Sequence, residues 1–190
     1  MKMLGRYLKL RPRAVQVFEM QPCPENITVC TDSDHAGCVI TCRSTTGTAI
    51  DHGQHLLKAS ANTQTVISVS SGESEFYAIV RGVSAGLGCQ SMARDFSQTK
   101  GLVIKTDATA GKGMSQRLGA GKVRHLQTQY PWVQDVFHTR TATLRKIPGP
   151  LNPADLMTKH VGAEDINRLF PLLSFYFTDG RSDLSLRASV

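Results

Sequence analysis

Residues 26–38, NITVCTDSDHAGC, join an apolar segment directly to two acids. The segment from Ile27 to Cys30 has the composition of a buried strand, and Asp32 and Asp34 follow at its end. A carboxylate at the end of a core strand costs free energy unless a cation or hydrogen bonds compensate its burial. The stretch therefore raises the question whether other acids of the chain converge on the same point.

The order of strand and helix signals indicates an α/β fold with a mixed sheet. Apolar segments separated by Gly, Asn and polar turns predict strands at residues 27–31, 45–51, 56–59, 65–69, 102–105 and 141–147. Helices are expected at residues 70–96, 127–138, 152–160 and 163–173. Three consecutive antiparallel strands are expected in the first half of the chain.

Two of the helices begin with recognisable capping residues. Ser70 and Glu73 form a capping box at the start of the long helix. Asn152 is expected as the N-cap of the later helix, with Pro153 in its first position. Glycines within the long helix lower its intrinsic propensity, which indicates that it packs closely on a sheet.

Four carboxylates fall at the ends of these elements. Asp32 ends the first strand, Glu75 lies in the first turns of the long helix, Asp107 ends a later strand, and Asp155 lies in the first turn of a later helix. In open α/β sheets, sites lie at the carboxyl ends of strands and at helix starts. Clustered carboxylates repel one another unless cations neutralise them, and Mg²⁺ prefers such oxygen ligands. The pattern predicts a divalent-metal site.

The net charge of +7 is concentrated in one part of the chain. Residues 100–150 hold nine Lys and Arg against two acids, whereas the remainder balances at thirteen against thirteen. A localised basic region indicates a polyanionic partner, most simply nucleic acid. A solvated basic face without a partner is the alternative interpretation.

Several other classes of protein are disfavoured. No run of about 18 apolar residues occurs, so no membrane partner is expected. The basic N-terminus lacks the apolar segment of a secretory signal. Five cysteines without a C-x-x-C pair are typical of reduced thiols inside cells. His35, Cys38 and Cys42 lack a fourth zinc ligand at a usual spacing.

Six motifs, in order and in spacing, resemble the ribonuclease H domain of copia-type (Pseudoviridae-like) LTR retrotransposon polyproteins. They are TDSDHAGC (31–38), RSTTG (43–47), SSGESEFYA (70–78), IKTDATAGKGM (104–114), GKVRHLQTQYPWVQ (121–134) and KIPGPLNPADLMTKH (146–160). Residues 4–18, LGRYLKLRPRAVQVF, are similar to the end of the reverse transcriptase that precedes this domain. No Y-x-D-D motif occurs, so polymerase activity is not expected.

The resemblance implies a ribonuclease H-like fold, with a five-stranded mixed sheet, three antiparallel strands first, flanked by helices. It divides the chain into a remnant of the reverse-transcriptase end or linker (1–25), the ribonuclease H-like domain (26–175) and a mobile C-terminal tail (176–190). The chain is expected to be a fragment of a longer polyprotein, acting in cytoplasmic virus-like particles or in the nucleus, with the reverse-transcriptase domain as its partner.

The resemblance also implies endonucleolytic hydrolysis of the RNA strand of RNA–DNA hybrids, leaving 5′-phosphate products. Two Mg²⁺ ions are expected, with Mn²⁺ as an alternative. The four metal-binding carboxylates of the family fall on Asp32, Glu75, Asp107 and Asp155. Asp32 is expected to bridge both ions, Glu75 and Asp107 to hold the ion on the leaving-group side, and Asp155 to hold the ion that activates water.

Two of these assignments have local alternatives. Asp34 shares a strand face with Asp32 and is the alternative first aspartate. Glu73 lies about 200° around the helix from Glu75, so both cannot face one site. Because Glu73 already has a role in the capping box, Glu75 is the expected metal ligand.

Further residues are expected to contact the hybrid. Contacts to RNA 2′-hydroxyls across the minor groove are assigned to Ser33, Asp34, Ser74 and Glu75. Contacts to phosphates of the DNA strand are assigned to Lys112, Arg117, Lys122, Arg124 and His125. A structural role for His125 is equally consistent with the sequence. Cellular ribonucleases H place a histidine where this chain has Arg145, so proton transfer or product release would be slower, or would use Arg145 or Lys146.

Two other functions remain open. A catalytically impaired remnant of the same fold would bind nucleic acid or act as a scaffold without cutting. An integrase or other DNA nuclease on a related fold is less consistent with the sequence, because those enzymes lack a glutamate on the long helix after three antiparallel strands. A cleavage assay on RNA–DNA hybrid, with and without Mg²⁺, distinguishes these functions.

Overall fold

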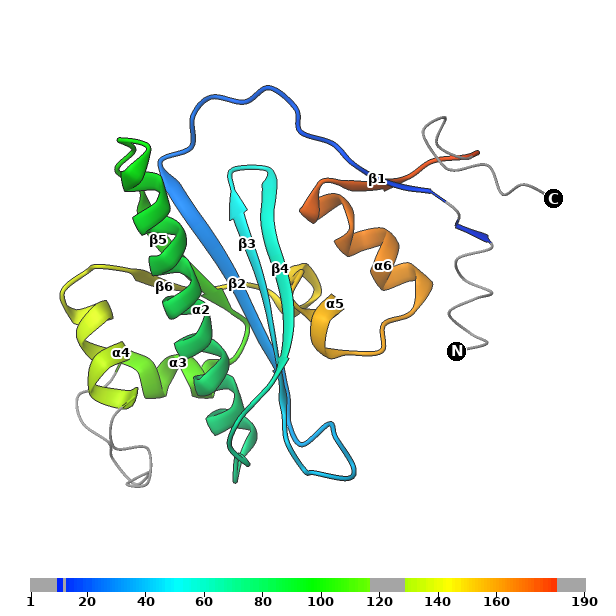
Figure 1. Ribbon diagram of the computed structural model, residues 1–190. Helices are drawn as coiled ribbons and strands as arrows, with labels where there is room; N and C mark the ends of the chain where they lie inside the picture. The colour runs from blue at the N-terminus through cyan, green and yellow to red at the C-terminus, as the bar shows by residue number, and fades with distance from the viewer. Residues whose placement is uncertain (1–9, 12, 117–128, 181–190) are drawn as a thin grey trace.

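The computed structural model describes residues 10–11, 13–116 and 129–180 (Figure 1). A five-stranded sheet has the order β4-β3-β2-β5-β6. Its strands are β2 (Asn26–Asp34), β3 (Thr45–His52), β4 (His55–Thr63), β5 (Gly101–Thr106) and β6 (Thr143–Lys146). The helices are α2 (Ser71–Asp95), α3 (Thr109–Gln116), α4 (Gln129–His138), α5 (Asp155–Thr158) and α6 (Ala163–Leu169), with the 3₁₀ turns η1 (Gly149–Leu151) and η2 (Pro171–Leu173).

The strand directions confirm the predicted mixed sheet. β2, β3 and β4 pair antiparallel, whereas β5 runs parallel to β2 and β6 runs parallel to β5. The carboxyl ends of β2, β5 and β6 therefore lie at one edge of the sheet. This is the edge at which Asp32 and Asp107 follow their strands.

Strand alternation divides the core between the two faces of the sheet, because successive side chains point to opposite sides. Figure 1 shows α2, α3 and α4 on one face and α5 and α6 on the other. The first face buries residues that include Val29, Ile50, Phe76, Ile79 and Ile104. The second face buries Cys30, Ala49, Leu56, Ala154 and Leu173.

Glycines let α2 pack directly on the sheet, as the sequence predicts. A Cβ at Gly82 would lie 2.4 Å from Thr31 Cγ2, and a Cβ at Gly86 would lie 2.6 Å from Leu102 Cδ1. Gly88 differs, because nothing lies within 4 Å of a Cβ at that position.

The predicted strand at residues 65–69 does not form. β4 instead extends to Thr63, and the following residues turn towards the start of α2. The buried side chain of Gln64 holds this turn, since its Nε2 donates to Thr46 Oγ1 (3.0 Å) and to the Ser74 carbonyl (2.9 Å). The apolar side chains of Val66, Ile67 and Val69 are left at the surface.

Other predicted boundaries differ near Pro and Asn residues. The expected helix at residues 163–173 is broken after Leu169, and Pro171 begins η2. The helix expected to start at Asn152 begins at Asp155, with Ala154 as its N-cap residue. Residues 127–128 of the predicted helix 127–138 lie outside the described part of the chain.

A second, two-stranded sheet joins the two ends of the described chain. β1 (Ala14–Gln16) pairs antiparallel with β7 (Phe175–Phe177), and Phe170 stacks on Phe177 with ring centroids 4.9 Å apart. β1 lies in the segment expected as a linker, and β7 crosses the expected boundary between the domain and the tail at residues 175–176. Residues 181–190 lie outside the described part. No helix among the described residues has the length and apolar character needed to cross a membrane.

Candidate metal and active site

Three carboxylates meet at the carboxyl edge of the parallel strands. Asp32 is in β2, Asp107 directly follows β5, and Asp155 is the first residue of α5. Each offers a carboxylate oxygen that lies within 4.8 Å of those of the other two. Asp32 and Asp107 come together because Thr31 and Thr106, the residues before them, are paired in the parallel register of β2 and β5.

Gly47 brings the third carboxylate into the group. It lies opposite Asp32 in the β2–β3 register, and a Cβ at Gly47 would be 2.7 Å from the Ala154 carbonyl oxygen. The same Cβ would be 2.8 Å from Thr158 Cγ2. The missing side chain therefore lets α5 lie directly on β3, with Asp155 beside Asp32.

Asn152 connects this turn to the other two acids. The side chain is fully buried, and its Nδ2 donates to the Thr31 carbonyl (3.0 Å) and to Asp107 Oδ1 (3.4 Å). Its Oδ1 accepts from the Ala154 backbone N–H (3.2 Å). Asn152 was expected only to cap a helix. The contact with Asp107 joins residues distant in sequence, so local patterns did not reveal it.

Lys159 supplies a positive charge to the acidic group. Its Nζ lies 2.9 Å from Asp155 Oδ1 and 3.4 Å from Asp32 Oδ2. Burial lowers the pKa of Lys159, but the hydrogen bond to Asp155 and the surrounding carboxylates raise the pKa more, so the net shift is upward. Thr158 also donates a hydrogen bond to the Asp32 carboxylate. Both residues fall within the motif 146–160, but sequence reasoning assigned neither a role.

Asp32 is the most enclosed of the three acids, with 2% of its surface exposed. Burial raises the pKa of Asp32 to about 6. The hydrogen bond from Thr158 and the charge of Lys159 oppose this shift, whereas Asp155 and Asp107 add to it. A buried carboxylate surrounded by other carboxylates is the environment that a divalent cation stabilises.

Glu75 approaches the group from the other face of the sheet and lies outside the set of three. Burial raises the pKa of Glu75 to about 8, and the charges of Asp32 and Asp107 add to the shift. Its Oε2 is buried without a hydrogen-bond partner among the described residues. An unpaired buried carboxylate oxygen and three converging aspartates form a donor set of hard oxygens, which fits a hard metal cation.

The two alternative acids have other contacts. Asp34 accepts a hydrogen bond from the Thr45 backbone N–H, across the loop between β2 and β3. Glu73 donates its backbone N–H to Ser70 Oγ (3.2 Å), which is the predicted N-cap bond. The Glu73 carboxylate accepts from the Val69 backbone N–H (2.9 Å), one residue before the position expected for a capping box.

The residues predicted to contact nucleic acid have varied environments. Ser33 and Ser74 are buried, and Ser33 Oγ donates to Ser74 Oγ (3.1 Å), so this pair joins β2 to α2. Lys112 is half-buried on α3, and Arg145 is exposed on β6. Lys146 donates to Thr109 Oγ1 (2.9 Å). Four further predicted contacts lie outside the described residues: Arg117, Lys122, Arg124 and His125.

Not every cation of the basic segment is available to a partner. Lys100 is buried, and its Nζ donates to the Pro24 carbonyl oxygen (2.9 Å) and to Cys23 Sγ (3.0 Å). Lys100 therefore attaches the segment before β2 to the start of β5.

Comparison with solved structures shows which fold this is. LC11-RNase H1, isolated from compost by a metagenomic approach, matches with a TM-score of 0.54 and 17% identity, over 70% of this chain and 93% of that chain. The chain has a ribonuclease H-like fold. RNase H1 from the archaeon Halobacterium salinarum NRC-1 matches with a TM-score of 0.48 and 11% identity, over 70% of this chain and 94% of that chain. Prototype Foamy Virus protease-reverse transcriptase matches with a TM-score of 0.45 and 9% identity, over 85% of this chain and 22% of that chain.

No protein-family model matches the chain, and neither does any curated protein. The comparisons therefore establish the fold, and a fold alone does not determine function.

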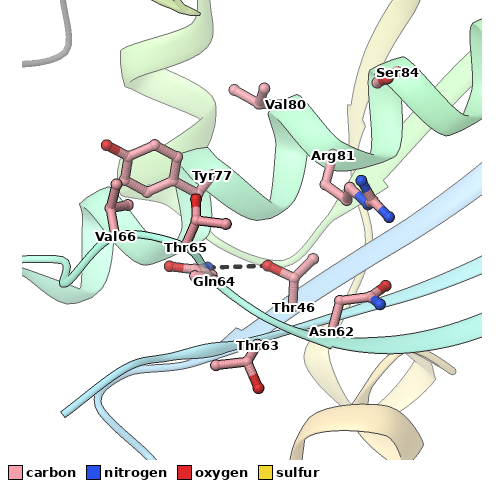
Figure 2. A pocket seen from close by; sticks show the side chains of 10 residues that line it. All are labelled: Thr46, Asn62, Thr63, Gln64, Thr65, Val66, Tyr77, Val80, Arg81 and Ser84. Atoms are coloured by element: carbon pink, nitrogen blue, oxygen red, sulfur yellow. Dashed lines mark hydrogen bonds between the residues drawn. The ribbon is translucent and has the colours of Figure 1, made fainter. Parts of the chain in front are cut away.

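A groove of about 420 Å³ lies on the face of the sheet that α2 covers, between α2 and the edge strand β4. Figure 2 shows Tyr77, Val80 and Arg81 projecting from α2 above the Gln64–Thr46 hydrogen bond. None of the clustered aspartates lines this groove. The groove is therefore separate from the acidic site.

Proposed function

We propose that this chain is a divalent-metal-dependent ribonuclease H that hydrolyses the RNA strand of RNA–DNA hybrids and leaves 5′-phosphate ends. The observation that carries the proposal is the convergence of Asp32, Asp107 and Asp155 at the carboxyl edge of a ribonuclease H-like sheet. The same edge is where α/β sheets bind their ligands.

The chain's own side chains would hold the metal. Asp32, Asp107 and Asp155 offer the three clustered oxygens, and Glu75 offers a buried oxygen from α2. Bound divalent ions supply an activated water and neutralise the charge of the phosphodiester. Because burial raises the pKa of Asp32 to about 6 and that of Glu75 to about 8, metal binding at neutral pH would release protons mainly from Glu75.

Neighbouring side chains would orient these ligands. Asn152 holds Asp107 through its Nδ2, and Thr158 holds Asp32 through its hydroxyl. Lys159 is 44% exposed, so its ammonium group can leave the carboxylates and face a substrate phosphate. Asn152 and Thr158 would thus fix the orientation of the metal ligands, and Lys159 would neutralise charge on the substrate.

We also propose the wider setting that the six motifs imply. The domain would belong to a copia-type retrotransposon polyprotein and act beside its reverse-transcriptase domain, in cytoplasmic virus-like particles or in the nucleus. Arg145 and Lys146 would contact the nucleic acid from β6, and Lys112 would contact it from α3. Asp34 and the four basic residues at positions 117–125 complete the proposed contact set, whereas the buried Ser33 and Ser74 would hold β2 and α2 together beside it.

The test is a cleavage assay on RNA–DNA hybrid, double-stranded RNA and double-stranded DNA, each with Mg²⁺ and with EDTA. We expect Mg²⁺-dependent cleavage of the RNA strand in the hybrid alone. Asp107→Asn should lower the rate by ~10² or more, since charge stabilisation at the metal is lost. Asp135→Asn, an exposed site on α4, is the matched control and should cut normally. Cleavage that persists in EDTA or in Asp107→Asn contradicts the proposal.

A second candidate function is a non-catalytic nucleic-acid-binding or scaffolding module of the same fold. The contacts of Lys159 favour it, because an ammonium group neutralises the acids that a metal would need. In that case hybrid would bind with a salt-dependent affinity, Mg²⁺ would not change the binding isotherm, and no RNA would be cut.

A further inference from the structure

The buried side chain of Gln64 holds the start of α2, and only 7% of the residue is exposed. Its Nε2 donates to Thr46 Oγ1 (3.0 Å) and to the Ser74 carbonyl (2.9 Å), and its Oε1 accepts from Ser68 Oγ (3.0 Å). These contacts fix the orientation of the amide, because a carbonyl oxygen such as that of Ser74 can only accept a hydrogen bond. Both polar atoms of the amide therefore have partners, and the side chain is held in one position.

Gln64 also belongs to the sheet through its backbone. Its N–H donates to the Ser44 carbonyl (2.7 Å), which continues the pairing of β3 and β4 beyond the end of β4. Figure 2 shows the bond from its side chain to Thr46, with Tyr77 and Val80 of α2 above it. Gln64 thus connects the sheet to the first turns of α2.

Ser74 is the residue of α2 that these contacts hold, and it is fully buried. Its carbonyl accepts from Gln64, and its hydroxyl accepts from Ser33 Oγ (3.1 Å). Ser74 directly precedes Glu75 in the chain, and Ser33 directly follows Asp32. The two hydrogen bonds therefore join the neighbours of two acids that lie on different elements.

Glu75 needs such support because its surroundings oppose its charge. Burial raises the pKa of Glu75 most, and the charges of Asp32 and Asp107 raise it further. Its Oε2 is buried without a hydrogen-bond partner among the described residues. Repulsion between the carboxylates favours a displacement of Glu75 away from the aspartates. The hydrogen bonds to Ser74 oppose this displacement.

We propose that Gln64 is a positioning residue for the acidic site, and that it holds the first turns of α2 so that the Glu75 carboxylate stays within reach of a metal ion at the three aspartates. Gln64 acts through Ser74 and is not itself a ligand. The inference rests on the proposed function, because it assigns Glu75 to the metal. Groups that orient metal ligands from outside the ligand set commonly change metal affinity strongly.

Gln64→Met is the first test, since methionine has a similar size and lacks the amide. The Mg²⁺ dissociation constant of the full chain, measured by calorimetry, should rise about tenfold. Cleavage of RNA–DNA hybrid should need correspondingly more Mg²⁺. The KM for hybrid should stay unchanged, and kcat should return to the wild-type value at saturating Mg²⁺, because the substitution alters the metal site alone.

Gln90→Met is the matched control near the other end of α2. Gln90 is 6% exposed, and its Nε2 donates to the Lys100 carbonyl (2.6 Å). Both substitutions remove a buried amide, so both should lower the free energy of unfolding in urea. Only Gln64→Met should change the Mg²⁺ dissociation constant, which separates a positioning role from general stabilisation.

Thr46→Val is a second, milder variant that keeps the shape of the side chain and removes one partner of Gln64. It should weaken Mg²⁺ binding in the same direction but less than Gln64→Met, and it tests the proposal even where Gln64→Met does not fold.

Equal Mg²⁺ binding by the wild type and both variants would overturn the proposal, and so would an equally large change in Gln90→Met. Mg²⁺ binding by the wild type without RNA cleavage would count against the nuclease activity alone, because the role of Gln64 is measured by the Mg²⁺ dissociation constant. A wild-type chain that binds no Mg²⁺ would overturn both proposals.

Discussion

Lys159 shows how one side chain controls the acidic site. Carboxylate oxygens of three aspartates lie within 4.8 Å of one another, and the Lys159 ammonium group forms salt bridges with two of these residues, Asp32 and Asp155. The same ammonium group lowers the pKa of Asp32, which burial has raised. A metal ion must therefore compete with an internal cation for the same oxygens.

Replacing Lys159 by Gln should raise the affinity for Mg²⁺. Removing one partly exposed positive charge at this distance is worth about 1 kcal/mol, or about fivefold in the dissociation constant. Calorimetric titration measures the change, and Lys146→Gln on β6 is the control, since Lys146 contacts Thr109 rather than the acids. Equal or weaker Mg²⁺ binding by Lys159→Gln would show that the two cations do not compete.

At the scale of elements, glycines determine how closely helices approach the site. Gly47 lets α5 lie on β3, and Gly111 lets α3 lie on α2. In both cases a Cβ would meet backbone or Cβ atoms, which cannot rotate away. The positions of Asp155 and Glu75 therefore depend on residues that take no part in metal binding.

Gly47→Ala should displace α5 and weaken metal binding. Its Cβ would lie 2.7 Å from the Ala154 carbonyl oxygen, so the turn that carries Asp155 must move. We expect about 1–3 kcal/mol lower unfolding free energy and weaker Mg²⁺ binding, measured by urea denaturation and calorimetry. Gly88→Ala is the control, since nothing lies within 4 Å of its Cβ. Unchanged Mg²⁺ binding in Gly47→Ala would mean that α5 does not have to contact β3.

Gly111 and Gly113 provide a matched pair on α3. A Cβ at Gly111 would lie 2.9 Å from Glu75 Cβ, whereas nothing lies within 4 Å of one at Gly113. Gly111→Ala should therefore destabilise the fold and shift the NMR signals of Glu75. Gly113→Ala should stabilise the helix by up to about 1 kcal/mol. The same response to both substitutions would argue against close packing of α3 on α2.

At the scale of the molecule, three buried acids make stability depend on pH. Their folded pKa values are about 6 for Asp32, about 7 for Asp51 and about 8 for Glu75, all above ordinary values of 3.8 to 4.5. Between these values and pH 4 the folded state holds protons that the unfolded state has released. The unfolding free energy should therefore fall as the pH rises from about 4 to about 8.

Urea denaturation at pH 5 and pH 8 in EDTA measures this effect. We expect a loss on the order of a few kcal/mol at pH 8. Mg²⁺ should restore most of the unfolding free energy that is lost through Asp32 and Glu75. Asp51→Asn should abolish the share of the loss that is due to Asp51. Equal unfolding free energy at both pH values would contradict the burial of these carboxyls.

The sequence predicted the order of elements well because periodicity and capping are local. The long helix begins at Ser70 as expected, and five of the six predicted strands form. The strand predicted at residues 65–69 was wrong. Its β-branched residues favour a strand, but the hydrogen bonds of Gln64 turn the chain away from the sheet and towards α2. The pairing of β1 with β7 was not predicted, since it joins residues about 160 positions apart along the chain.

The sequence by itself determined which chemical groups are present and where they fall on each element: acids at strand ends and helix starts, with a basic segment after residue 100. Only the tertiary structure decided that Asp32, Asp107 and Asp155 form one group, that Glu75 approaches from the opposite face, and that Asn152, Thr158 and Lys159 contact the acids. The physical reason is that strand and helix signals depend on neighbours in sequence. Distances between carboxylates depend instead on sheet register and on how closely glycine lets a helix pack.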